Sequence, residues 1–236
     1  MNNKIFFKPH IGNNHQQRLV LLSTISCPHV TDCNKDYEKC TKGMSYMYDT
    51  ECEFRNCKTD KGSTPIPLSE SFLYQLETYF KDDYKGYDLK KNKTYCKLTN
   101  AFAEAIGYKI PPVTEKEKRS VWDNFICTEL CQHFTREATT SITDFNNDDF
   151  LAFLELIRHY NITKIVLCGK PSFLFIEKAI DTCKHTYIEK KSSDQYIYDL
   201  RIYNRSVRLY RVHHPSYRNF EDNGKLIPIL RNFISK

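Results

Sequence analysis

Three short apolar runs constrain the fold of this chain more than any other feature. Residues 18–25 (Arg-Leu-Val-Leu-Leu-Ser-Thr-Ile) and 164–168 (Lys-Ile-Val-Leu-Cys) are continuous runs, typical of strands buried on both faces of a sheet. Residues 207–212 alternate apolar side chains with basic and aromatic ones, which is also a strand pattern. We therefore expect these three segments to be neighbouring strands of a central, largely parallel sheet with helices on both faces, a three-layer α/β/α fold.

Helical patterns are expected between these strands. Apolar side chains at helical spacing, together with capping residues, predict helices near residues 69–80, 99–106, 114–134, 146–157, 172–183 and 226–233. The third of these helices would carry Glu129 and Gln132 among apolar residues that face the core. Residues 195–203 are predicted to form a hairpin with 207–212, joined by Asn204 and Arg205.

Length and composition are those of a globular protein. The chain has 236 residues, 40% of them hydrophobic and 27% charged, which favours a single domain spanning residues 1–236. It contains no apolar run of 18 residues, so no membrane partner is expected, and its first residues lack the apolar core of a signal peptide. The predicted location is therefore the cytoplasm. The net charge of +6 permits, but does not require, binding to nucleic acid.

A cysteine-rich insertion is predicted at residues 27–67. Five of the ten cysteines fall in it, and they are Cys27, Cys33, Cys40, Cys52 and Cys57. Because disulfides are rare in the cytoplasm, we consider zinc as a cofactor, with Cys33, Cys40, Cys52 and Cys57 as ligands and Cys27 as a further candidate. The Cys-x2-Cys spacing of many zinc sites is absent, and the alternative is a surface insertion with reduced cysteines. Cys127 and Cys131 are interpreted as packing residues.

The polar residues that follow the predicted strands form a candidate site. Ligand crevices in parallel sheets lie outside the carboxyl ends of the strands, where the loops after residues 22, 168 and 212 should meet. The third strand stops at His213-His214-Pro215-Ser216, because proline has no amide proton for the ladder. We expect His214 to point into a concave site lined by Ser23–Ser26, Gly169 and Lys170.

Four short motifs follow one another along most of the chain. They are Lys8-Pro-His-Ile-Gly12, Trp122-Asp-Asn-Phe with Gln132 ten residues on, the strand Ile165–Gly169, and His214-Pro215-Ser216. In this order they resemble motifs of the uracil-DNA glycosylase superfamily, in particular a bacterial branch of it. The resemblance implies a uracil-DNA glycosylase-like domain and a hydrolase that cleaves the N-glycosidic bond of a damaged or modified base, as in DNA repair. Such enzymes act on a base flipped out of the duplex.

The resemblance also implies roles for individual residues. His214 would act on the base side of the bond, Ser216 would contact a phosphate, and Tyr217 or Arg218 would be a wedge in the minor groove. Lys170 and Arg211 are further cationic candidates for binding nucleic acid. Arg208 lies in the same predicted strand and adds to the positive charge.

The first predicted strand and the residues that follow it depart from that branch of the superfamily. Its members have a strand of the form Leu-Leu-Leu-Gly-Glu-Ser-His, whereas this chain has Leu22–Ser26 without a carboxylate or histidine. Ser26, His29 or Asp32 could substitute, and Glu129 stands where relatives carry asparagine. Three hypotheses follow: an active glycosylase-like enzyme, a catalytically inactive relative that binds nucleic acid or a protein partner, and a zinc-stabilised α/β protein without this activity. The base and the oligomeric state are left open.

Overall fold

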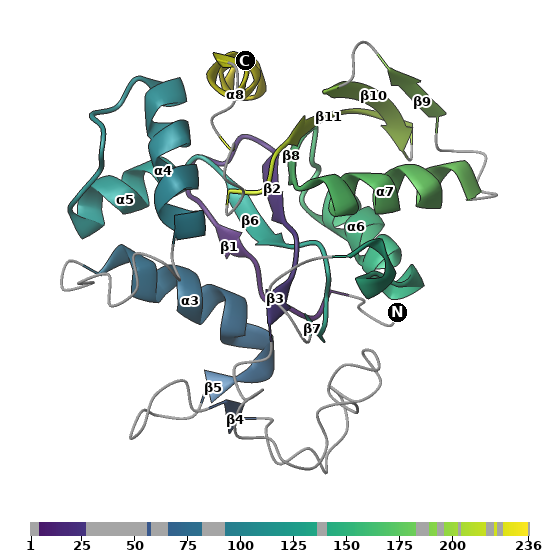
Figure 1. The fold of residues 1–236 in the computed structure, drawn as a ribbon, viewed down its shortest axis with the longest axis horizontal. Coiled ribbons are helices and arrows are strands. Elements are labelled where there is room, and N and C mark those ends of the chain that lie inside the picture. Colours follow the sequence, from purple (N-terminus) through teal and green to yellow (C-terminus); the bar gives the residue numbers. More distant parts are fainter. Residues whose placement is uncertain are drawn as a thin grey trace.

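A mixed β-sheet forms the centre of the protein (Figure 1). The computed structural model describes residues 5–26, 56–57, 66–81, 93–135, 141–182, 189–192, 196–202, 204–215, 220 and 224–235. Within this part of the chain, seven strands form one sheet in the order β1-β6-β2-β8-β11-β10-β9. The strands are β1 (His10–Ile11), β2 (Arg18–Leu22), β6 (Ile126–Glu129), β8 (Lys164–Cys168), β9 (Glu189–Ser192), β10 (Ile197–Ile202) and β11 (Arg205–Val212).

The four central strands, β6, β2, β8 and β11, run parallel to one another. The outer strands β1, β10 and β9 pair antiparallel with their neighbours. The prediction that 18–24, 164–168 and 207–212 are neighbouring strands of one sheet is confirmed, because β8 lies between β2 and β11. The predicted hairpin is formed by β10 and β11. Two small pairs complete the described strands: β3 (Ile25–Ser26) with β7 (Phe134–Thr135), and β4 (Asn56–Cys57) with β5 (Ile66–Pro67).

Helices cover both faces of the sheet (Figure 1). One face packs against α3 (Ser71–Phe80), α4 (Lys93–Ile106), α5 (Glu115–Trp122) and α8 (Leu226–Ile234), and the other against α6 (Asn147–His159) and α7 (Lys170–Thr182). Short 3-10 turns lie at Leu68–Glu70 (η1) and Ile142–Asp144 (η2). The α/β class predicted from the apolar runs is therefore confirmed.

The continuous apolar run of β2 supplies both hydrophobic cores. Leu19 and Leu21 are buried against α6 and α7, whereas Val20 and Leu22 are buried on the opposite face. Successive side chains of a strand point to opposite faces, so a strand covered on both sides needs apolar residues at every position. This explains why the sequence shows a run here instead of an alternation.

The helix predicted for residues 114–134 is wrong in its second half. It begins as expected, with Thr114 as N-cap and Glu117 completing a capping box, but α5 ends at Trp122. The chain then enters β6, where all four residues are buried and pair in parallel with β2. An apolar run that is buried on both faces of a sheet does not differ in its pattern from the buried face of a short helix. Glu129 consequently lies at the end of a strand.

Gly12, in the first of the four motifs, serves close packing of the backbone. Its amide donates a hydrogen bond to the carbonyl of Phe125 at 2.9 Å, directly before β6. A Cβ at position 12 would lie only 2.4 Å from the carbonyl oxygen of Asp123. Only glycine allows the two segments to approach this closely.

None of the described helices combines the length and the apolar character needed to cross a membrane.

Candidate functional site

The four parallel strands end side by side at one edge of the sheet. This edge, formed by the carboxyl ends of β6, β2, β8 and β11, is called the carboxyl edge below. Leu22 of β2 is the register partner of Glu129 of β6, and Val212 of β11 is the partner of Cys168 of β8. Backbone pairing continues past the strands, because Gly169 donates to the carbonyl of Val212 at 2.9 Å. The residues that follow these strands are therefore held together by the ladder itself.

Ser23, Gly169, Ser172 and His214 meet at this edge. A Cβ built on Gly169 would lie 3.6 Å from His214 Cβ, 3.7 Å from Ser172 Oγ and 3.8 Å from Ser23 Oγ. The two serine hydroxyls are 2.7 Å apart and both are buried. Gly169 has a φ of +96°, a conformation that favours glycine, and it turns the chain from β8 into α7. The loops after residues 22, 168 and 212 thus converge.

His214 is half-buried in this cluster. Burial lowers the pKa of its imidazole from 6.5 to about 4, because desolvation disfavours the charged form. The ring is therefore neutral at physiological pH and offers one N–H donor and one acceptor nitrogen. A neutral imidazole can donate a hydrogen bond to an oxygen on which negative charge develops.

Glu129 places a carboxyl group at the same edge, on the face that α4 covers. The residue is only 4% exposed, and its Oε2 has no hydrogen-bond partner among the described residues. Burial raises the pKa of Glu129 to about 8, so the group is largely protonated at neutral pH. Its negative charge, when present, raises the pKa of Tyr95, Cys127 and Cys168 further, after the larger effect of their own burial.

Gln132 holds the backbone around Glu129. Its side-chain Oε1 accepts hydrogen bonds from the amides of Phe6 and Phe7, each at 2.9 Å, and its Nε2 donates to the carbonyl of Glu129 at 2.5 Å. The backbone amide of Gln132 in turn donates to Asp149 Oδ1 at 2.7 Å. The glutamine of the Trp122 motif therefore ties the N-terminal segment and α6 to the end of β6.

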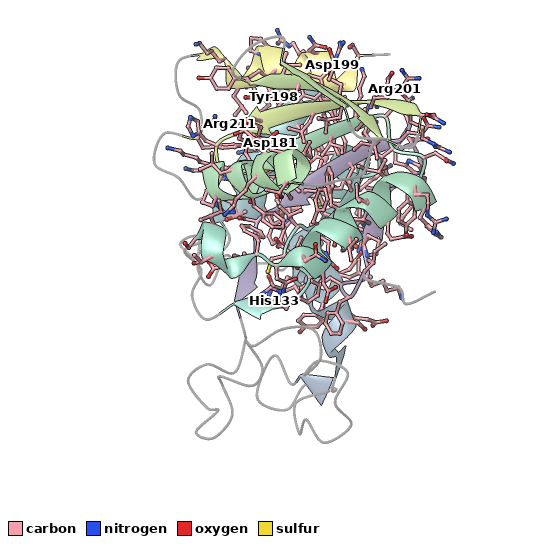
Figure 2. The ribbon with its side chains drawn as sticks, turned by 90° about the vertical axis from the view of Figure 1, so that its right-hand side faces the viewer. His133, Asp181, Tyr198, Asp199, Arg201 and Arg211 are labelled. Carbon is pink, nitrogen blue, oxygen red and sulfur yellow. The ribbon has the colours of Figure 1, made fainter. Side chains whose placement is uncertain are left out.

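The cationic candidates lie in two different places. Lys170 is exposed at the start of α7, and the guanidinium of Arg211 lies 5.0 Å from the centre of the Phe173 ring, near that start. Arg208, in contrast, pairs with Lys164 at the amino end of β8 and forms an ion pair of 2.6 Å with Asp199. Arg208 therefore lies away from the carboxyl edge, and the prediction that it adds positive charge to this site is wrong. Figure 2 shows Asp199 and Arg211 apart on the hairpin.

A second polar cluster is formed by Cys131, His133 and Asp149. All three are buried, and one ligand atom from each lies within 4.8 Å of the others. The prediction for Cys131 was packing alone, and it does pack in the core against α6 and α7. The signal that could have found the cluster is the Cys-x-His spacing, but Asp149 is 16 residues further on, inside the helix predicted near residues 146–157.

Several predicted site residues lie outside the described part of the chain. Two further predicted residues are inside it, because Ser26 lies in β3 and Cys57 lies in β4. The others are outside the described residues: Cys27, His29, Asp32, Cys33, Cys40, Cys52, Ser216, Tyr217 and Arg218. The predicted cysteine ligands and the predicted wedge residues therefore stay predictions.

What the carboxyl edge can bind has to be inferred from the side chains that stand there. No family model, curated protein or solved structure matches the chain. At the edge stand a neutral imidazole, a protonated carboxyl and a pair of hydroxyls, with Lys170 and Arg211 beside them. Both the imidazole and the protonated carboxyl carry one donor and one acceptor. This combination suits the polar edge of a neutral heterocycle better than an ion.

Proposed function

We propose that the protein binds nucleic acid at the carboxyl edge of its sheet and hydrolyses the N-glycosidic bond of a flipped, damaged or modified base. The observation that carries the proposal is the convergence of His214 and Ser23 on Gly169, where a Cβ would lie within 4 Å of a side-chain atom of each. Two of the four motifs that resemble uracil-DNA glycosylases, Ile165–Gly169 and His214-Pro215-Ser216, are adjacent through this convergence.

The reaction requires help on both sides of the bond. Water adds to the anomeric carbon of the sugar and releases a proton, while the bonding electrons leave with the base, which then takes up a proton. Negative charge develops on the base as the bond breaks, and the neutral His214 imidazole can stabilise it by donating its N–H. An ordinary histidine would be partly charged at pH 6.5, whereas this one stays neutral, so it carries its N–H donor without a change of protonation.

Glu129 is proposed to recognise the base. Its protonated carboxyl pairs a donor with an acceptor, as the asparagine of relatives does through its amide. Two strands, β2 and β8, separate β6 from β11, so the backbones that carry Glu129 and His214 are about 14 Å apart. A base bound between the two strands would contact the Glu129 carboxyl only where it enters the buried face that α4 covers.

A catalytically inactive relative that binds nucleic acid is the second candidate. The observation in its favour is that Leu22–Ser26 contains no carboxylate, while Glu129 is largely protonated at neutral pH. The reaction needs an anionic carboxylate to position water or to stabilise the developing positive charge on the sugar, and neither Leu22–Ser26 nor the protonated Glu129 supplies one. Such a protein would bind the same oligonucleotides without releasing a base.

Binding itself is tested by a salt titration. Wild type, Lys170→Ala and Lys178→Ala are titrated with labelled single- and double-stranded oligonucleotides at several salt concentrations. Lys170 and Lys178 are exposed on the same helix, but only Lys170 lies at the site. We expect Lys170→Ala to weaken binding several-fold and to reduce the salt slope by about 1, because one phosphate contact is lost. Lys178→Ala should match wild type.

Absence of binding to either form at low salt would refute the proposed function and the second candidate together. Equal effects of the two lysine substitutions would place the nucleic acid elsewhere on the protein.

A further inference from the structure

Two side chains of the segment between β6 and β7 and one side chain of α6 bring a sulfur, a nitrogen and an oxygen atom together. Cys131 Sγ lies 3.3 Å from His133 Nδ1 and 3.4 Å from its Nε2, and Nδ1 lies 3.4 Å from Asp149 Oδ1. Cys131 and Asp149 are fully buried and His133 is 5% exposed. Figure 2 shows His133 below α6 and α7, the two helices that cover this face of the sheet.

Two of these separations have the lengths of edges of a zinc coordination tetrahedron. Zinc binds thiolate sulfur at about 2.3 Å and imidazole nitrogen or carboxylate oxygen at about 2.0–2.2 Å. At tetrahedral angles these bond lengths place sulfur and nitrogen about 3.5 Å apart, and nitrogen and oxygen about 3.4 Å apart. The observed 3.3 Å and 3.4 Å are close to both values. Because Sγ is about as near to Nε2 as to Nδ1, the imidazole has to turn about its Cβ–Cγ bond for the Nδ1 lone pair to point at a shared ion.

Backbone hydrogen bonds hold two of the three ligands, Cys131 and Asp149, in place. The Cys131 backbone amide donates to the carbonyl of Ser23 at 3.1 Å, which fixes the second residue after β6. The Asp149 carboxylate accepts from the amides of Gln132 at 2.7 Å and Asn146 at 2.8 Å. The Asn146 side-chain amide lies 3.4 Å from His133 Nδ1 and borders the cluster. A ligand set that is already ordered loses little entropy when a metal binds.

We propose that Cys131 Sγ, His133 Nδ1 and Asp149 Oδ1 bind a Zn²⁺ ion. Thiolate and carboxylate together carry a charge of −2, which one divalent cation neutralises in a buried place. Three protein ligands leave a fourth position for water or another ligand. This site is distinct from the cysteine set predicted in residues 27–67, and it does not depend on the proposed function.

The ion would stabilise the neighbourhood of the carboxyl edge. His133 directly precedes β7, which pairs with β3, and Cys131 is bound to Ser23 through its amide. A metal at this point would link α6, the end of β6 and the β3–β7 pair. Chelation should therefore lower the melting temperature of the intact protein.

Metal analysis of the purified full-length protein tests the proposal. We expect about one equivalent of zinc per chain at this site, lost in Cys131→Ser and in His133→Gln. A variant with serine at Cys33, Cys40, Cys52 and Cys57 is the matched control and should keep this zinc. Loading with Co²⁺ should give a thiolate-to-cobalt charge-transfer band that Cys131→Ser abolishes and Cys96→Ser retains.

Two outcomes would overturn the proposal. One is purified protein that holds no zinc and takes up neither Zn²⁺ nor Co²⁺ in a titration, which would leave His133 and Asp149 as an ion pair only. The other is zinc that survives in both Cys131→Ser and His133→Gln but disappears in the four-cysteine variant. Circular dichroism of each variant checks that it is folded, and His133→Gln supplies the test if Cys131→Ser fails to fold.

Discussion

Replacing Glu129 by glutamine should remove much of the pH dependence of stability between pH 4.5 and about 8. Burial raises the pKa of this carboxyl from 4.5 to about 8. In the unfolded chain the group loses its proton near pH 4.5, whereas in the folded protein it keeps the proton up to about pH 8. Its contribution to stability is thus fully present below pH 4.5 and is lost as the pH rises through about 8.

The difference between the two pKa values corresponds to about 5 kcal/mol at most. Denaturant unfolding of wild type and Glu129→Gln across this pH window measures it as a difference between two free energies. His214 contributes in the opposite direction: its folded pKa of about 4 lies below 6.5, so its contribution is present above pH 6.5 and lost as the pH falls through 4. That effect is common to both proteins and cancels.

Glu104→Gln is the control, since Glu104 is an exposed glutamate on α4. We expect Glu129→Gln to become steadily more stable relative to wild type as the pH rises, and Glu104→Gln to show a small difference that changes little. A flat difference for Glu129→Gln across the window would show that the carboxyl is ionised in the folded protein.

Asp149→Ala should destabilise the protein by about 4 kcal/mol, even when a chelator keeps it free of metal. The carboxylate accepts two backbone hydrogen bonds, from Gln132 and Asn146, and each bond to a charged group is worth about 1.5–3 kcal/mol. Its loss also leaves the Gln132 amide buried without this acceptor. Thermal or denaturant unfolding in the chelator measures the change.

Asp148→Ala is the matched control, one residue earlier in the first turn of α6. It should cost less than about 1 kcal/mol, the usual effect of an acidic residue at a helix N-terminus. Equal losses for the two variants would mean that Asp149 acts through the helix dipole alone.

The central strands could be predicted because burial on both faces demands continuous apolar runs. The sequence shows such runs at β2 and β8, and β11 shows alternation followed by proline. The strand β6 could not be predicted in the same way, because Phe125–Leu130 follows a capped helix and continues its apolar pattern. Whether the chain forms another turn of helix or a strand is decided by the partner β2, which the local sequence does not contain.

The candidate site was predictable where it follows strand ends and unpredictable where it depends on β6. Ser23, Gly169 and His214 each come directly after a recognisable strand, so their meeting follows from parallel topology. Glu129 was expected on a helix, which concealed its place at the carboxyl edge. Cys131 and His133 lie between β6 and β7 and Asp149 lies on α6, and only the structure defines how these segments pack.

Release of a free base under single-turnover conditions tests the proposed site most directly. Wild type, His214→Ala and His213→Ala are incubated with oligonucleotides that carry uracil or another modified base. We predict that wild type releases a base, that His214→Ala is slower by about 10²-fold with binding changed by less than about 3-fold, and that His213→Ala resembles wild type. No release from any substrate by wild type, or equal rates for wild type and His214→Ala, would contradict the proposed role of this site.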